Sequence, residues 1–243
     1  MKSNRTVNRS IERSACQVRS EQTRRRLIEV AVGAFSELGY EATSTRIIAE
    51  QAQTSQISIF YYFGSKRGLY RAAAEFVGSN IARLFQPVCD IARQGLVSTA
   101  LTHDQTLSMF IEFIAGIMRA ESDAGTPNSW VQFIRRERVD STEALEIFNT
   151  QYASTFEVGL EFISRLTKLS AKAAETRLQL LAVLSMSELL RTDRSSVLRI
   201  MGWKAFGEKE TRILESTLRD NLRALYAHKN LRRELSQSPC VDP

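Results

Sequence analysis

The side chains with the clearest potential for recognition chemistry are gathered in one short segment, residues 56–63. Ile59 and Phe63 stand four residues apart, so on a helix they share the face that packs inward. The side chains left to point outward are those of Gln56, Ser58, Tyr61 and Tyr62. A glutamine can read adenine through two hydrogen bonds, and a tyrosine hydroxyl can donate to a phosphate. The segment therefore has the chemistry of a contact with nucleic acid.

Catalytic chemistry has little support in the sequence. The two histidines are His103 and His228, and no nucleophile motif accompanies either of them. Cys16, Cys89 and Cys240 are far apart and lack the spacing of a metal site or a disulfide framework. The sequence contains no nucleophile-elbow, zinc-protease, phosphate-loop or dinucleotide-binding motif. We therefore expect no enzyme activity, no metal and no cofactor.

Positive charge is concentrated near the N-terminus. Residues 1–26 hold eight basic and two acidic side chains, and this surplus equals the net charge of +6. Residues 27–71 are balanced, so a DNA-binding segment there depends on the basic arm for most of its electrostatic attraction. Residues 1–19 show no hydrophobic period and are predicted to be disordered. The arm is either a solvated leader or a segment that touches nucleic acid.

A pair of short helices is predicted between two longer ones. The first long helix begins near Glu21–Thr23, and Gly39 ends it. The polar link at 41–44 carries N-cap residues, and the break at 52–55 carries a second set. Gly64–Ser65 then stops the second short helix before the next long one begins. Two short helices separated by a turn of about three residues are the helix-turn-helix arrangement.

The remainder of the chain is predicted to be helical. Glycine (11) and proline (4) are scarce, which disfavours the tight turns of an all-β fold. Apolar residues recur at steps of three and four, with breaks near 125–127, 140–141, 191–195 and 202–207. The predicted fold is all-α, with a disordered arm over 1–19, a three-helix helix-turn-helix domain over 20–66, a larger helical domain over 67–230 and a flexible tail over 231–243.

The segment from Gly39 to Ala52, followed by Ser55–Lys66 and Leu69, resembles the DNA-binding domain of the TetR family of repressors. The resemblance implies phosphate contacts from Thr43, Ser55, Tyr62 and Lys66. It implies contacts in the major groove from Gln56, Ile57, Phe60 and Tyr61. The predicted DNA-binding set is completed by Ser44, Arg46 and Ser58.

Three positions depart from the pattern of that family. Gln53 stands in the turn where the family usually has glycine, so we expect the turn to adopt another backbone solution. Phe60 replaces the usual tyrosine and lacks the hydroxyl that often reaches DNA. Ile57 is larger than the small residue common there, and it either contacts a thymine methyl group or widens the packing. The departures leave the detailed DNA contacts open.

The C-terminal part resembles the CecR-type subgroup of the same family at residues 133–137 and 197–208. This resemblance implies a dimerisation domain that encloses a pocket for an unidentified small-molecule inducer. The apolar faces of helices at about 171–192 and 208–228 favour an intermolecular four-helix bundle, the alternative being that they complete the core of the monomer. The candidate pocket residues, for each of which an ordinary core position is the alternative, are Phe110, Phe113, Met118, Trp130, Phe133, Phe156 and Met186.

We therefore expect a cytoplasmic, homodimeric transcription regulator that binds a pseudo-palindromic operator in double-stranded DNA. The resemblance implies a repressor that a ligand releases from the operator. The sequence contains no apolar run approaching the roughly 20 residues that span a bilayer, so we expect no membrane contact. The alternative is a helical small-molecule carrier or scaffold that has lost specific DNA binding, which the departures at Gln53 and Phe60 leave open.

Overall fold

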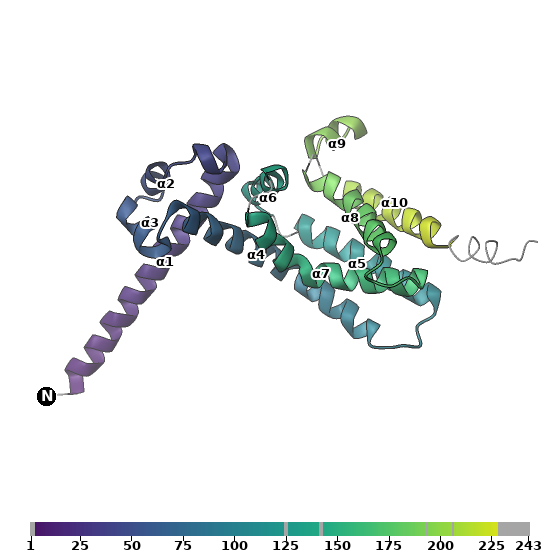
Figure 1. Ribbon diagram of the computed structural model, residues 1–243, viewed down its shortest axis with the longest axis horizontal. Coiled ribbons are helices and arrows are strands. Elements are labelled where there is room, and N and C mark those ends of the chain that lie inside the picture. The colour runs from purple at the N-terminus through teal and green to yellow at the C-terminus, as the bar shows by residue number, and fades with distance from the viewer. Residues whose placement is uncertain (1–2, 124–125, 141–142, 193, 206, 228–243) are drawn as a thin grey trace, which may run out of the picture. The chain divides into compact units, whose positions relative to one another are not determined.

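The computed structural model describes residues 3–123, 126–140, 143–192, 194–205 and 207–227. Within these ranges the chain forms ten helices and no strand, which confirms the predicted all-α class (Figure 1). The helices are α1 (Ser3–Ala42), α2 (Thr45–Gln51), α3 (Gln56–Phe63), α4 (Lys66–Leu96), α5 (His103–Asp123), α6 (Asn128–Asp140), α7 (Glu143–Thr167), α8 (Ala174–Thr192), α9 (Arg194–Met201) and α10 (Glu208–Ala227). Across the described ranges, no helix is long and apolar enough to cross a membrane.

The predicted caps of the short helices are present. The hydroxyl oxygens of Ser44 and Ser55 each accept a hydrogen bond from a backbone N–H three residues further on, at 3.2 and 3.3 Å. They therefore cap the N-termini of α2 and α3. Gly39, with φ at 81°, interrupts α1, and Gly64, with φ at 73°, follows α3. Both glycines adopt the positive φ that side chains disfavour, as predicted for residues that end helices.

Helix α1 differs most from the prediction. It begins at Ser3, well before the predicted start near Glu21–Thr23, so the arm expected to be disordered is helical over residues 3–19. Residues 3–20 contain neither glycine nor proline, and a helix that is already formed extends at little further cost. The prediction of disorder rests on the lack of a hydrophobic period. Such a period indicates that a helix packs against another element, but a helix can form its backbone hydrogen bonds without it. The predicted tail at 231–243 lies outside the described residues.

The chain divides into two compact units, and unit 1 comprises Met1–Asn80 and Pro127–Thr150. Its core is built on Phe35 of α1, which packs edge-to-face on Tyr70 of α4 with ring centroids 4.9 Å apart. Phe35 also stacks on Phe133 of α6 at 6.5 Å, and all three rings are buried. Unit 1 therefore extends beyond the predicted domain of 20–66, because α4 and α6 supply the aromatic partners of α1.

Polar contacts reinforce unit 1 around this aromatic core. Arg67 of α4 forms a two-point ion pair with Glu143 of α7 at 2.8 and 3.0 Å, and it lowers the pKa of that carboxyl. The Tyr70 hydroxyl donates to the buried carboxylate of Glu137. The Arg136 guanidinium donates to a backbone carbonyl of α1 at 3.1 Å. The first turns of α4 and the end of α1 are thus tied to α6 and α7.

Unit 2 comprises Ile81–Thr126 and Gln151–Pro243. Its core contains Phe110 of α5, which packs against Phe162 of α7 and Tyr226 of α10 at centroid distances of 5.6 and 5.8 Å. All three rings are completely buried. Burial raises the pKa of Tyr226 above its usual range, so its hydroxyl stays protonated. The aromatic contacts hold α5, α7 and α10 together.

A network of charges joins α5 to α10 on the surface of unit 2. Arg119 pairs with Glu215 at 2.9 Å, and Arg219 pairs with Glu112. The hydrogen bond from Arg219 lowers the pKa of Glu112. Because each helix supplies one cation and one anion, the network fixes the register of α10 along α5.

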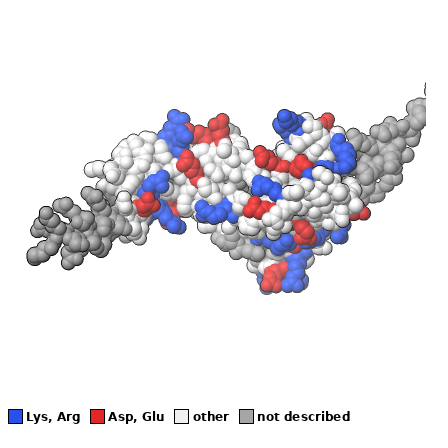
Figure 2. All heavy atoms as spheres, turned by 90° about the horizontal axis from the view of Figure 1, so that it is seen from below, with Lys and Arg blue, Asp and Glu red and all other residues white. Residues whose placement is uncertain are grey.

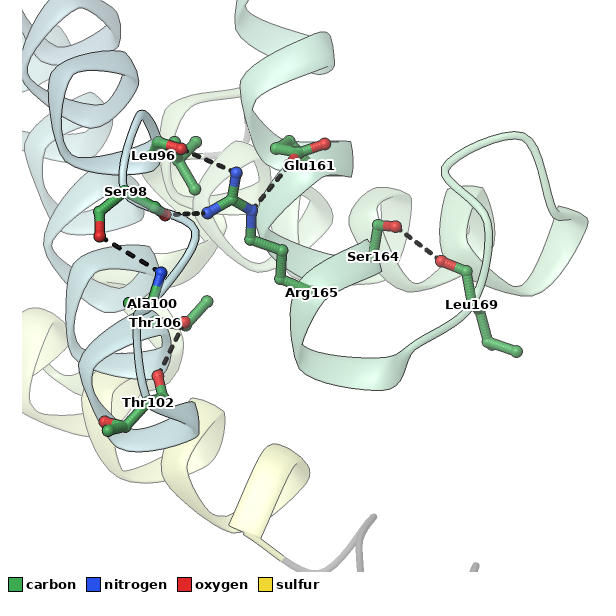
Figure 3. Close-up of polar contacts among 9 residues, drawn as sticks. All are labelled: Leu96, Ser98, Ala100, Thr102, Thr106, Glu161, Ser164, Arg165 and Leu169. Carbon is green, nitrogen blue, oxygen red and sulfur yellow. Dashed lines mark hydrogen bonds and ion pairs between the residues drawn. The ribbon is translucent and has the colours of Figure 1, made fainter.

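Arg165 of α7 holds the C-terminal end of α4, as Figure 3 shows. Its guanidinium donates to the carbonyl oxygens of Leu96 at 2.7 Å and Ser98 at 2.8 Å. The carboxylate of Glu161, one turn earlier in α7, accepts a third hydrogen bond at 2.7 Å and so orients the guanidinium group of Arg165. The last carbonyls of a helix have no partner within it, so Arg165 supplies that partner.

The junction between α3 and α4 requires a glycine. A Cβ atom on Gly68 would lie 2.0 Å from the carbonyl oxygen of Phe63, which is far inside van der Waals contact. The backbone N–H of Gly68 donates to the hydroxyl of Ser65 at 3.0 Å, so Ser65 caps the N-terminus of α4. The end of α3 is thereby held close to the first turn of α4.

We expect Gly68→Ala to lower the free energy of unfolding by about 2 kcal/mol, because the new methyl group displaces the backbone of Phe63. Gly33→Ala in α1 is the matched control, since a Cβ there meets nothing within 4 Å. Alanine is the better helix former, so this control should raise the free energy of unfolding by up to about 1 kcal/mol. Denaturant unfolding measures both values, and equal stability of the two variants would contradict the close approach.

Candidate nucleic-acid interface

Helix α3 is held by one fully buried side chain and one half-buried ring. Ile59 is completely buried, as the sequence predicts for the inner face of the helix. Phe63 is half-buried, and the Arg24 guanidinium of α1 lies over its ring, 5.4 Å from the centroid. An arginine over an aromatic face is attracted electrostatically, so this contact brings positive charge to the end of α3.

The opposite side of α3 faces solvent and is largely apolar. Exposed fractions are 78% for Ile57, 53% for Phe60 and 79% for Tyr61. Gln56 is exposed beside them. These four residues, spaced at one, three and four positions, form one continuous side of the helix, which we call the exposed face of α3. They are the four residues predicted to contact the major groove.

The hydroxyl groups of Thr45 and Ser20 orient the Gln56 amide and the Tyr62 ring of α3. The Gln56 amide donates to the Thr45 hydroxyl of α2 at 3.1 Å. The Tyr62 hydroxyl lies 3.0 Å from the Ser20 hydroxyl of α1, and the Tyr61 ring packs edge-on against that of Tyr62 at 4.9 Å. Thr45 and Ser20 carry no signal of these roles in the sequence, because each contact joins separate helices.

Thr43, predicted to contact phosphate, has a different position. Its side chain is 1% exposed, and its hydroxyl donates to the carbonyls of Gly39 at 2.6 Å and Ala34 at 3.2 Å. The hydroxyl is therefore bonded within the protein, to two carbonyls of α1, one before and one at the bend at Gly39. A contact of this hydroxyl with phosphate is not compatible with its burial. The sequence pattern marks the position but not the direction of the side chain.

The remaining predicted polar residues lie on or beside α2 and α3. Ser58 is half-buried, and its hydroxyl lies within 3.2 Å of that of Ser55. Arg46 of α2 is exposed and pairs with Glu50 at 2.9 Å. Ser44 and Ser55, the two N-caps, are also exposed. A helix N-terminus presents free N–H groups, so the starts of α2 and α3 suit an anionic partner.

Lys66 begins α4 directly after the turn that follows α3. Its ammonium donates to the carbonyl of Glu41 at 3.2 Å and lies 4.4 Å from the centroid of the Tyr40 ring. These contacts place a positive charge next to the end of α1. The lysine remains partly exposed, so its ammonium keeps access to solvent.

Gln53 itself adopts the conformation that glycine usually supplies in the turn between α2 and α3. Its φ is 52°, which costs a side-chain-bearing residue about 1 kcal/mol. The Thr54 N–H donates to Ala49 and the Gln53 N–H to Glu50, the paired bonds of a Schellman motif. The Arg26 guanidinium donates to the Gln53 amide oxygen at 2.6 Å. The expectation of another backbone solution was therefore wrong: the turn keeps its left-handed residue, and α1 holds the side chain.

The predicted ligand-lining residues are divided between the two units. Phe133 and Trp130 belong to unit 1, where Trp130 packs edge-on against Phe76 at 5.7 Å. The members that belong to unit 2 are Phe110, Phe113 and Met118, all buried, and Phe156, which is half-buried. Met186 lies outside the residues whose side chains are described. A ligand-lining role stays a prediction, since these rings also pack as ordinary core residues.

Charges of both signs are mixed over the described part of the surface that Figure 2 displays. Basic and acidic groups alternate there, and several of the ion pairs are intrahelical, such as Arg25 with Glu29 at 2.8 Å. Elements next to α3 in the sequence or in contact with it supply positive side chains: Arg24 and Arg26 of α1, Arg46 of α2 and Lys66 at the start of α4. Exposed pairs of this kind contribute little to stability, so their cations can exchange an intramolecular partner for a phosphate.

Two family models match the chain. The model for bacterial regulatory proteins of the tetR family matches residues 27–73, which include α2, α3 and the exposed face. The model for the C-terminal domain of the HTH-type transcriptional dual regulator CecR matches residues 104–228. The chain belongs to the TetR family. Both resemblances expected from the sequence are confirmed, and the protein is a DNA-binding transcription regulator.

Relatives of known sequence or structure agree with this assignment. The HTH-type transcriptional dual regulator CecR of Shigella flexneri is 29% identical over 84% of this chain and 91% of its own length. A solved transcriptional regulator from Pseudomonas aeruginosa PAO1 has a TM-score of 0.57 at 20% identity, covering 84% of this chain and 91% of its own. A TetR-family structure from Mesorhizobium loti gives 0.53 at 15% identity, covering 86% and 98%. At these identities the solved structures support the fold alone.

We expect Lys66→Ala to weaken binding to all DNA sequences and to make the dependence of log affinity on log salt less steep by about one. The reason is that the variant loses the ammonium that is predicted to neutralise one phosphate. Lys66→Arg keeps the charge, and Lys172→Ala removes an exposed lysine far along the chain; both should leave the slope near that of the parent protein. Fluorescence anisotropy across a salt series measures the slope, and an unchanged slope for Lys66→Ala would contradict a phosphate contact.

Proposed function

We propose that this TetR-family regulator is a repressor that binds a pseudo-palindromic operator as a homodimer and leaves it when a small molecule binds. The observation that carries the proposal is the exposed face of α3, where three large apolar side chains face solvent on a short, well-anchored helix. The major groove of DNA is about 12 Å wide and admits such a helix. Insertion of the exposed face removes these side chains from water, and the flanking cations meet the phosphates.

The dimer interface we propose is formed by α8 and α10, the helices that correspond to the predicted segments 171–192 and 208–228. Helix α8 exposes Leu178 (65%) and Leu181 (52%), and α10 exposes Ile213 (40%) and Leu225 (42%). Exposed apolar side chains on both helices favour burial against a second copy in a four-helix bundle. Two-fold symmetry then presents two copies of α3 to successive turns of DNA, about 34–36 Å apart.

Release by a ligand is proposed to act through α4. This helix contributes residues to both compact units, and Arg67 and Tyr70 in its first turns are bonded to α7 and α6. A ligand that shifts α4 near residues 66–84 would change the separation of the two DNA-binding heads. It shifts the equilibrium only if it binds the DNA-incompetent arrangement more tightly. The predicted ligand-lining residues belong to this proposal, and the inducer is an unidentified small molecule.

A gel-shift assay with DNA from immediately around the gene of the protein tests the regulator directly. We expect sequence-specific retardation that unlabelled random DNA does not abolish, and loss of the shifted band on addition of an inducing ligand. Absence of retardation at low salt favours a helical carrier or scaffold instead. Candidate ligands that raise the melting temperature but leave operator affinity unchanged would contradict release by a ligand, while leaving DNA binding intact.

We expect Leu181→Glu to convert the dimer into a monomer at micromolar concentration, because a buried unpaired carboxylate is costly. Operator affinity should fall with it, since one helix-turn-helix binds weakly. Val97→Glu is the matched control: Val97 is 81% exposed and lies outside the proposed interface. Size-exclusion chromatography with light scattering measures the mass. A parent chain that is already monomeric, or a Leu181→Glu variant that remains dimeric, contradicts the interface.

A further inference from the structure

The exposed face of α3 is uncharged and largely apolar. None of the eight residues of α3, all of which the structure describes, is acidic or basic. Ile57 and Tyr61 are more than three-quarters exposed, and Phe60 is more than half exposed. Large apolar side chains gain binding free energy when they contact another apolar group and water is excluded from between them.

The exposed face of α3 lacks the side chains that most often recognise guanine. The commonest specific contact to guanine is an arginine or lysine that bonds to both O6 and N7. The described cations on neighbouring elements have other contacts: Arg24 lies over the Phe63 ring, Arg26 bonds to Gln53, Arg46 pairs with Glu50, and Lys66 bonds to a carbonyl of α1. In the proposed function these cations would meet the DNA backbone, whereas the bases would meet the uncharged face.

The Gln56 side chain retains the hydrogen-bonding groups that an adenine contact needs. Its amide nitrogen carries two hydrogens, and one hydrogen bond goes to the Thr45 hydroxyl at 3.1 Å. One donor and the carbonyl acceptor remain, which is the pair that binds N7 and N6 of adenine in the major groove. The contact to Thr45 also restricts the rotation of the side chain, so less conformational freedom is lost on binding.

The apolar groups of the face match the one apolar group in the major groove. Thymine carries a C5-methyl group there, whereas unmodified cytosine, adenine and guanine do not. Ile57 and Phe60 are three residues apart and therefore adjacent on the helix surface. Tyr61 is held beside them by its edge-on contact with Tyr62, whose hydroxyl is within hydrogen-bonding distance of Ser20. The face thus offers adjacent apolar contacts next to an adenine reader.

We infer that the exposed face of α3 recognises a half-site rich in A·T base pairs, in which Ile57 and Phe60 bind thymine methyl groups and Gln56 binds adenine. The inference rests on the proposed function, because it assumes that α3 enters the major groove. It assigns sequence preference to methyl contacts rather than to charged side chains. Ionic strength should therefore change the affinity of the protein far more than its choice of sequence.

Selection of bound sequences from random duplex DNA, followed by replacement of thymine with uracil, tests this inference. Uracil lacks only the C5-methyl group. We expect the selected half-site to be dominated by A·T pairs, and we expect affinity to fall about fourfold for each contacted thymine that is replaced, the effect of one buried methyl group. Replacement at thymines outside the half-sites is the internal control and should leave affinity unchanged.

Combining alanine variants with the uracil replacements shows which residue contacts which thymine methyl group. Ile57→Ala should make affinity insensitive to uracil at one selected position, and Phe60→Ala at another, whereas Gln56→Ala should relax the preference at one A·T pair. Ile200→Ala is the matched control, because Ile200 of α9 has the same exposed fraction as Ile57, 78%. This control should keep the full uracil effect.

The outcomes separate the inference from the proposed function. Enrichment of a palindromic site dominated by G·C pairs, or one whose affinity does not respond to uracil, overturns the inference and leaves operator binding intact. Enrichment of no sequence overturns both. An A·T-rich site with a uracil effect that Ile57→Ala and Phe60→Ala each remove at one position supports both.

Discussion

The DNA-binding helices depend on a core that they cannot build alone. Helices α2 and α3 have seven and eight residues, and helices of that length do not persist in water by themselves. Ile48 and Ile59, one from each helix, are completely buried. Helix α3 packs on α2, and α2 packs on α1. Phe35 of α1 in turn contacts Tyr70 of α4 and Phe133 of α6. The direction of the exposed face of α3 therefore depends on aromatic packing between three other helices.

A buried hydrogen bond between α4 and α6 stabilises the observed arrangement of these two helices in unit 1. The carboxyl group of Glu137 is buried and accepts a hydrogen bond from Tyr70, so separation of α6 from α4 breaks a hydrogen bond to a buried polar group. Loss of such a partner costs more than the net gain of an exposed hydrogen bond. A ligand that moves α4 must therefore offset this cost through its own preference for the displaced arrangement.

Affinity and sequence choice have separate physical origins in the DNA-binding region. The helix that enters the groove in our proposal carries no charge, and the positive side chains come from α1, α2 and the start of α4. Arg24 and Arg26 belong to the basic N-terminal segment, and both contact residues at or beside α3. The basic segment is thus connected to the helix-turn-helix by specific contacts as well as by its net charge.

Local chemistry was sufficient to predict much of the fold. The N-caps at Ser44 and Ser55 and the glycines at 39 and 64 act through bonds or backbone angles of near neighbours, so their residue types already indicate the helix ends. Periodicity indicates the inner position of Ile59 in the same way. The start of α1 was not predictable by that route, because no side chain there needs to pack. At Gln53 the residue type was misleading, because Arg26, 27 residues earlier, holds its side chain.

Residue types and periods indicate a helical chain with a helix-turn-helix, and the family resemblance implies the groove-contacting set Gln56, Ile57, Phe60 and Tyr61, which the structure places on one side of α3. Periodicity alone predicts Ser58 and Tyr62 to point outward, and both are half-buried. Periods and caps are local properties, which is why the printed residues suffice for these conclusions. Contacts in the folded protein were needed to show that Thr43 faces inward, that Tyr62 contacts Ser20 and that α6 belongs to the unit of the DNA-binding helices. Each of these depends on contacts between segments distant in the chain, where many pairings satisfy the same pattern and packing selects one.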